Sequence, residues 1–248
     1  MAGTCRAPGC VRTDLCRAHV VPAGFARRLS DPGGHNRAVR STGLTPAPQP
    51  HGEFDRDLLC RKCDERLCLY DGYAIRFCAS LPATGHAQAG SVFRHAPFDG
   101  GLFARAVLAI LWRASLSRRE QFAGIGLGPY AQRIGAILFG DAPLASLPEV
   151  EIVLHRYASD EHDARRFVFM PLRIRSGPLN AFTVGIGGFL VWTKVDRRPT
   201  DRLPAPFVIN VASELLAPIV RFEDTAEYAY FRRAARSERG HGSGTPAA

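Results

Sequence analysis

Apolar residues recur at helical spacing over residues 98–117, which predicts the strongest helix of the chain. Its apolar stripe consists of Leu102, Phe103, Val107, Ile110, Leu111 and Ala114. A second helix is predicted between residues 129 and 139, because Pro129 suits a first helical turn and Gly140 suits a helix end. Helical spacing also begins near Asp55 and again over residues 225–236.

Beyond Pro148 the pattern favours strands over residues 150–157, 166–174, 181–195 and 207–211. Polar turns separate them, so an antiparallel meander is the simplest topology. Gly185, Gly187 and Gly188 in the third segment indicate a bulge or a close approach of two backbones. The pattern as a whole predicts an α+β protein in which helices pack on an antiparallel β-sheet.

Three regions are expected along the 248 residues. Residues 1–80 hold the cysteines and form a small unit with a mobile loop near residues 37–52, where apolar periodicity is missing. Residues 98–236 form the helical and antiparallel β domain, and residues 237–248 form a disordered tail. A hydrophobic content of 46% is sufficient for a core.

The charge of the chain and its N-terminal sequence bear on its binding partner and its cellular location. Lys and Arg number 32 against 23 acidic residues, a formal net charge of +9 that fits a nucleic-acid partner, although an uninvolved basic surface fits it equally. The N-terminal residues lack the apolar stretch of a secretory signal, and no apolar run reaches the roughly 20 residues of a membrane helix. We therefore expect a cytoplasmic protein without a membrane partner.

All seven cysteines lie between Cys5 and Cys78, and in a reducing compartment this pattern favours a metal over disulfides. Two pairs have ligand spacing, so the predicted structural Zn²⁺ ligands are Cys5, Cys10, Cys60 and Cys63. Cys16 and His19 also have ligand spacing, and either is an alternative to Cys5. Cys68 and Cys78 are interpreted as small buried residues.

The order of these motifs resembles the HNH (His-Asn-His) family of treble-clef zinc proteins. The matching motifs are Cys-x4-Cys from Cys5, His-Val-Val-Pro from His19 and Leu-Leu-Cys-x2-Cys from Leu58, which cover the first third of the chain. The second half is similar to uncharacterised bacterial proteins that carry such a unit. The resemblance implies an N-terminal treble-clef (ββα-metal-like) zinc unit that binds nucleic acid, with DNA the expected form.

In a working HNH nuclease, His19 would be the general base and Asp64 a ligand for Mg²⁺ or Mn²⁺. Ala18 stands where the family has a second ligand, so Asp14, Asp31 or His35 would have to complete the site. The resemblance therefore implies nucleic-acid binding with a partly lost catalytic set. The alternatives are a metal-dependent DNA endonuclease and a zinc-stabilised module that binds a protein partner through the C-terminal half.

Basic residues surround the cysteines and are the predicted nucleic-acid contacts, with a solvated charged face as the alternative. These residues are Arg27, Arg28, Arg37, Arg40, Arg61, Lys62 and Arg66.

Overall fold

The computed structural model of the chain describes residues 3–27, 37–38, 47–48, 53–85, 88–200, 204–229 and 232. The helices of these residues are α1 (Ala23–Arg27), α2 (Arg61–Ser80), α3 (Gly100–Leu116) and α4 (Tyr130–Phe139). The strands are β1 (Ala18–His19), β2 (Arg37–Ala38), β3 (Ala47–Pro48), β4 (Phe54–Asp55), β5 (Val92–His95), β6 (Val150–Ala158), β7 (Phe169–Ser176), β8 (Leu179–Ile186), β9 (Phe189–Val195) and β10 (Leu215–Arg221). The fold is α+β, as predicted.

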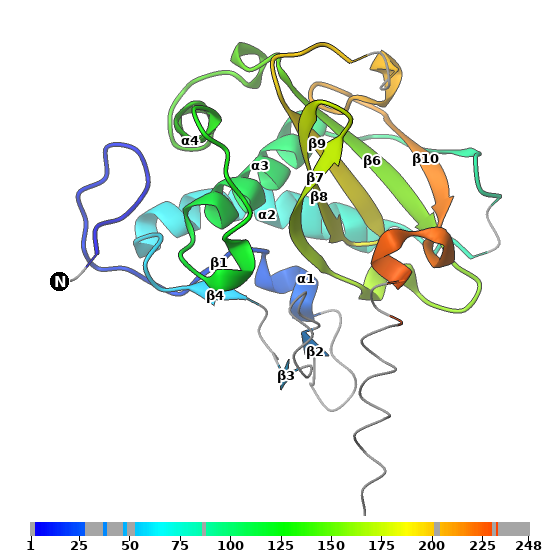
Figure 1. Ribbon diagram of the computed structural model, residues 1–248, viewed down its shortest axis with the longest axis horizontal. Helices are drawn as coiled ribbons and strands as arrows, with labels where there is room; N and C mark the ends of the chain where they lie inside the picture. The colour runs from blue at the N-terminus through cyan, green and yellow to red at the C-terminus, as the bar shows by residue number, and fades with distance from the viewer. Residues whose placement is uncertain are drawn as a thin grey trace, which may run out of the picture.

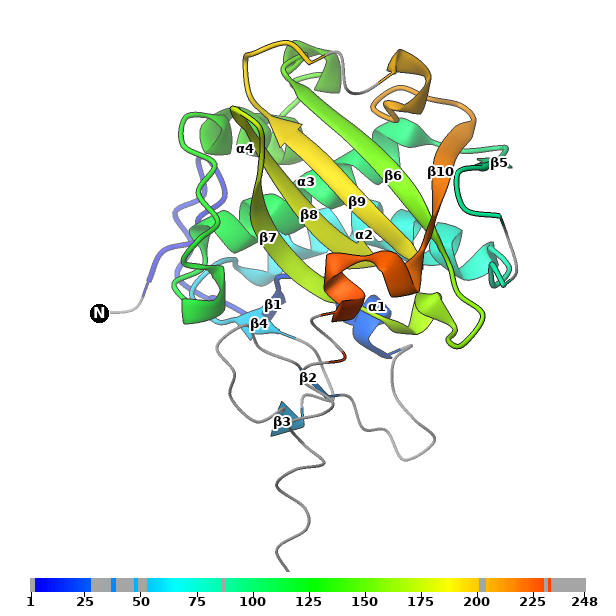
Figure 2. The ribbon, with the colours of Figure 1, turned by 45° about the vertical axis from the view of Figure 1, so that its right-hand side comes forward.

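Helix α3 lies at the centre of the molecule, between the large sheet and α2 (Figures 1 and 2). It is apolar on nearly every side, and its residues from Phe103 to Ala114 are buried apart from Arg105. Asp99 begins the helix, because its Oδ1 accepts a hydrogen bond from the backbone N–H of Leu102 at 2.8 Å. The helix predicted over residues 98–117 is thus confirmed, and its position makes it the organising element of the core.

The large sheet has six strands in the order β5-β10-β6-β9-β8-β7. Strands β6, β9, β8 and β7 are antiparallel neighbours, and so are β5 and β10. Strand β10 instead runs parallel to β6, which corrects the purely antiparallel prediction. The chain leaves β9 at the end where β6 begins, with Val195 opposite Val150, and enters β10 from that same end on the other side of β6. Strands β6 and β10 therefore run in the same direction.

The prediction of a strand at residues 207–211 is also wrong. The chain there forms a short 3-10 turn (Ala205–Phe207) and a single bridge between Val208 and Val153, and β10 begins only at Leu215. The side chain of Asn210 contributes to the pairing, because its Nδ2 donates to the carbonyl of Val150 at 2.7 Å and its Oδ1 accepts from Ile152 N–H at 3.2 Å. The side chain thus supplements the backbone bond from Ile209 N–H to Ile152 O at 2.9 Å in this loop.

The third predicted strand segment is a hairpin of β8 and β9 that turns at Gly187 and Gly188. Both glycines have a positive backbone φ angle, 58° and 84°, which residues other than glycine rarely adopt. A Cβ on Gly187 would also overlap the side chain of Cys78 on α2. The close approach that the glycines predict is therefore present, and it joins the hairpin to α2.

The N-terminal segment and the sheet share one core. Buried residues of the first 80 positions, such as Val20, Phe25 and Leu67, belong to the same hydrophobic cluster as Phe103 and Ile152. Helix α2 packs along α3 and extends from Arg61 to Ser80. The helix predicted to begin near Asp55 is thereby corrected, because Phe54–Asp55 forms strand β4 and the helix begins only at Arg61. The metal-ligand candidates on α2 thus lie on an element that the core holds in place.

Several predictions fall outside the described residues. Of the loop near residues 37–52, only the backbones of β2 and β3 are described, and these two strands pair antiparallel. The tail at residues 237–248 lies wholly outside them, as do Arg28 and Arg40. Among the helices of the described part of the chain, none has the combined length and apolar character of a membrane span.

Candidate metal centre and basic groove

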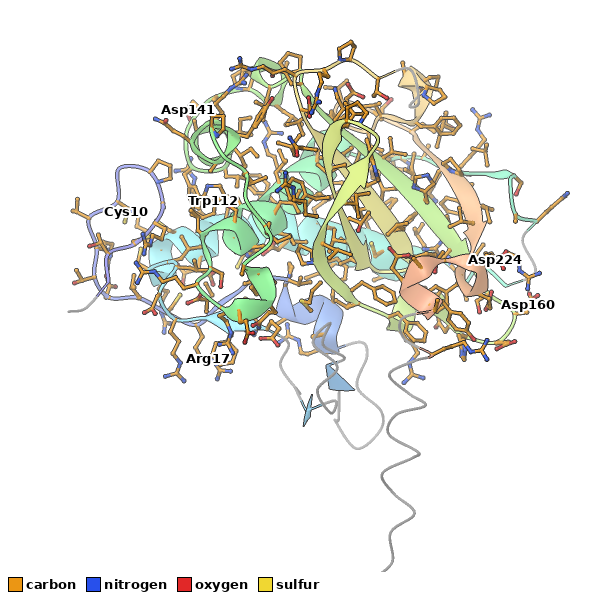
Figure 3. The ribbon with its side chains drawn as sticks, in the orientation of Figure 1. Cys10, Arg17, Trp112, Asp141, Asp160 and Asp224 are labelled. Atoms are coloured by element: carbon orange, nitrogen blue, oxygen red, sulfur yellow. The ribbon has the colours of Figure 1, made fainter. Side chains whose placement is uncertain are left out.

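The four predicted ligand cysteines converge at one point, although Cys10 and Cys60 are 50 residues apart in sequence. Their Sγ atoms all lie within 4.8 Å of one another. Cys5 and Cys60 are buried, whereas Cys10 and Cys63 are half-buried. Figure 3 labels Cys10 in the N-terminal loop, beside the start of α2. The four thiols form a cluster that could hold a metal ion.

A tight turn presents the first pair of sulfurs. The backbone N–H of Cys10 donates to Ala7 O at 3.0 Å, and Gly9 supplies the positive φ of 71° that the turn needs. A hydrogen bond from Cys5 N–H to Arg12 O at 2.8 Å closes the loop. Backbone hydrogen bonds of the turn thus position both thiols.

The second pair comes from the beginning of α2. Cys60 immediately precedes the helix and Cys63 lies in its first turn, so their three-residue spacing places both side chains on one side. Two hydrogen bonds tie the pairs together: Arg6 N–H donates to Leu58 O at 2.8 Å, and Cys60 N–H donates to Cys5 Sγ at 3.3 Å. An N–H donor to sulfur stabilises the thiolate that a metal requires.

The sulfur spacing fits a tetrahedral zinc ion. Four sulfurs at about 2.3 Å from Zn²⁺ stand about 3.8 Å from one another in a regular tetrahedron. The Sγ atoms of Cys10 and Cys60 are 3.9 Å apart, and all seven cysteines are free thiols. Burial raises the pKa of the Cys63 and Cys5 thiols, whereas the backbone N–H of Arg12 lowers that of Cys10. A bound cation would offset the cost of ionising the buried thiols.

The other cysteines stand apart from this cluster. Cys16 is half-buried, and burial raises the pKa of its thiol to about 11. Cys78 is buried in the core, as predicted, but Cys68 is exposed, which corrects the prediction for that residue. Cys68 follows Cys63 by five residues, and this spacing turns it away from the ligand side of the helix.

His19 and Asp64 have different neighbours in the structure. The His19 ring lies against Phe54 with centroids 6.1 Å apart. Asp64 lies on α2 near Arg113 and Asp71; burial raises the pKa of its carboxyl, and Arg113 opposes that shift. Within the described residues, neither His19 nor Asp64 belongs to a group of three side chains that could share an ion.

The residues suggested as further ligands do not complete a catalytic set in the described part of the chain. Asp14 is exposed and pairs with Arg12 at 2.8 Å. Asp31 and His35 lie outside the described residues. The roles of His19 as base and Asp64 as ligand therefore stay predictions.

An open groove of about 640 Å³ lies beside the cysteine cluster. Its lining combines four cationic side chains with two acidic ones and comprises Arg12, Asp14, Leu15, Cys16, Arg17, Arg61, Lys62 and Glu65. Arg61 and Lys62 were predicted contacts, whereas Arg12 and Arg17 were missed. The signal that could have found Arg17 was its position two residues before His19, the candidate catalytic residue.

The remaining predicted contacts lie away from this lining or are not described. Arg27 is exposed on α1 and Arg66 is exposed on α2, and neither lines the groove. Only the backbone of Arg37 is described, and Arg28 and Arg40 lie outside the described residues.

No protein-family model, curated protein or solved structure matches this chain. The resemblance to HNH proteins therefore rests on the cysteine, histidine and leucine motifs alone. The features that bear on the function of the chain are the cysteine cluster and the charges around it.

Proposed function

We propose that this chain is a zinc-binding protein whose N-terminal unit binds nucleic acid. The observation that carries the proposal is the cationic groove that adjoins the four-cysteine cluster at the beginning of α2. The order of elements supports an HNH-like, treble-clef arrangement, since a cysteine turn, the paired strands β1 and β4 and a helix with two cysteines follow one another.

The charge of the groove fits a polyanion. Asp14 is engaged by Arg12 through two hydrogen bonds of 2.8 and 2.9 Å, which leaves Arg17, Arg61 and Lys62 against Glu65. The net charge of +9 adds long-range attraction for a phosphate backbone. A metal that cross-links the N-terminal turn to α2 would hold Arg12, Arg17 and Arg61 in fixed positions, which reduces the entropy lost on binding.

Metal analysis tests the first half of the proposal. The purified chain should contain about one Zn²⁺ per molecule, as four thiolates make one tetrahedral site. Cys63→Ser should lose the zinc and unfold at a lower temperature, whereas Cys68→Ser, which changes an exposed cysteine of the same helix, should keep both. Equal zinc contents in the two variants would show that the ligands are wrongly assigned.

Binding to a fluorescently labelled mixed-sequence DNA duplex tests the second half. Affinity should fall steeply as salt rises from about 50 to 200 mM, because bound cations release counterions from the phosphates. Replacing Arg61 and Lys62 by Gln should weaken binding and flatten the salt dependence. The matched control replaces Arg76 of the same helix, outside the groove, and should have little effect. Absent or salt-insensitive binding would instead favour a protein-interaction module.

A further inference from the structure

The outward face of the small sheet carries a second group of cations. Strands β1 and β4 pair with His19 opposite Phe54 and Ala18 opposite Asp55. Side chains of a strand alternate between its two faces, so Ala18 and Asp55 turn inward, where they are 0% and 5% exposed. Arg17 and Arg56 directly flank the inward pair and are both exposed, and their guanidinium groups lie near the ring of Phe54.

Hydrogen bonds join this sheet to the segment that follows α3, and they place Arg119 beside Phe54. The Oδ2 of Asp55 accepts a hydrogen bond of 2.6 Å from the hydroxyl of Ser117, which directly follows α3. Two residues later, Arg119 donates to the carbonyl oxygen of Phe54 at 3.0 Å and lies 3.7 Å from the carboxylate of Glu53. The chain after α3 is thereby fixed against the edge of the outward face.

Three guanidinium groups gather around the one aromatic ring. The Cζ atom of Arg17 lies 3.9 Å from the ring centroid of Phe54, and those of Arg119 and Arg56 lie 5.7 and 5.8 Å from it. Figure 3 labels Arg17 at the lower left, where its side chain points away from the ribbon. We call Arg17, Phe54, Arg56 and Arg119 the Phe54 cluster.

The positive charge of this cluster is only partly compensated. In the part of the chain that the structure describes, Arg17 and Arg56 have no carboxylate partner, whereas Arg12, Arg94 and Arg133 each have one. Guanidinium groups gathered around one ring repel one another, because like charges at short range raise the electrostatic energy. Contact with the ring offsets part of this repulsion through cation–π attraction, but an anion would remove it.

We propose that the Phe54 cluster binds the phosphodiester backbone of nucleic acid and continues the path of the basic groove. A guanidinium that stacks on an aromatic ring keeps its N–H groups available at its edge, and these match the oxygens of a phosphate in a bidentate way. Arg17 belongs to both surfaces, because it also lines the groove. The cluster therefore provides phosphate contacts beside those of Arg61 and Lys62. This inference rests on the proposed nucleic-acid binding.

Arg56→Gln is the sharpest test, because Arg56 does not line the groove. Binding of the full-length, zinc-loaded protein to the labelled duplex is measured by fluorescence anisotropy at several salt concentrations. Loss of one phosphate contact should make the slope of log affinity against log salt less negative by about 0.9, and should weaken binding about tenfold near 0.1 M salt. Arg17→Gln combined with Arg56→Gln should roughly double the change in slope. Arg166→Gln, on the 3-10 turn before β7, removes the same charge elsewhere and should leave the slope unchanged.

Each outcome separates this inference from the proposed function. If the unmodified chain binds no duplex, the proposed function fails and the inference fails with it. If the chain binds but Arg56→Gln behaves as Arg166→Gln does, the proposed binding through the groove is retained and the Phe54 cluster is not a phosphate site. Polyglutamate that displaces the duplex from the unmodified chain but not from Arg56→Gln would assign the cluster to acidic polypeptides and overturn the inference. Zinc content and melting temperature establish that the variants are folded.

Discussion

The ion pair between Arg113 of α3 and Asp71 of α2 offers the most direct test of how the core holds the metal unit. Two parallel hydrogen bonds of 2.9 and 3.0 Å join the guanidinium to the carboxylate. The side chains are only 2% and 10% exposed. We expect Asp71→Ala to destabilise the protein strongly, because it leaves the charge of Arg113 buried without this partner.

The magnitude follows from that burial. Removing one member of a buried ion pair costs about 3–5 kcal/mol. Asp64 also interacts with Arg113, so partial compensation places the expected loss near the lower end, about 3 kcal/mol. For a chain of this size such a loss lowers the melting temperature by roughly 6–12 °C. Replacing both residues with apolar ones, Arg113→Met with Asp71→Leu, should recover most of the loss because no buried charge remains.

Urea unfolding of the zinc-loaded protein, followed by circular dichroism, measures these differences. Glu149→Ala provides a matched control, since it breaks an equally short but more exposed pair with Arg133 and should hardly change the midpoint. A loss below about 1 kcal/mol for Asp71→Ala would refute the reasoning, as would a double variant less stable than the single one.

Three further predictions concern backbone packing, pH and catalysis. Gly100→Ala should destabilise the protein by about 1–3 kcal/mol, because the added methyl overlaps a facing backbone carbonyl, whereas Gly126→Ala, which projects into open space, should be nearly neutral in the same urea assay. Hydrogen bonds from Arg198 hold the pKa of Asp196 below its ordinary value of 3.8, so its stabilisation is present above that pH and is lost as pH falls through the lowered value. The difference in unfolding free energy between the unmodified chain and Asp196→Asn should therefore be widest at neutral pH and shrink in acid; a constant difference would contradict this assignment. Under the nuclease alternative, His19→Ala should abolish Mg²⁺- or Mn²⁺-dependent nicking of plasmid DNA without loss of zinc, and an unmodified chain that nicks with neither ion would remove that alternative.

Local patterns were sufficient for the features that depend on near neighbours. The helical spacing of residues 98–117 predicted α3, because an amphipathic or fully apolar helix is encoded within a few turns of sequence. The spacing of Cys60 and Cys63 likewise indicated which side chains share one side of a helical turn. The pairing of this turn with Cys5 and Cys10 was predicted from ligand chemistry, and the cluster of their sulfurs is present.

Other features depend on residues that only packing brings together. Strand β10 runs parallel to β6 because of the path that the chain takes around the sheet, and no alternation of apolar residues records that path. The buried charge of Arg113 lies within an apolar stripe and is tolerated because α2 places Asp71 opposite it.

The Phe54 cluster draws on the same principle. The sequence by itself determined that a basic, cysteine-rich segment precedes a helix, and it predicted that this segment holds zinc. The pairing of β1 with β4 and the docking of Arg119 decided which arginines share one surface. Contacts between residues distant in sequence are set by the packing of whole elements. Which residues form the Phe54 cluster could therefore be known only from the tertiary structure.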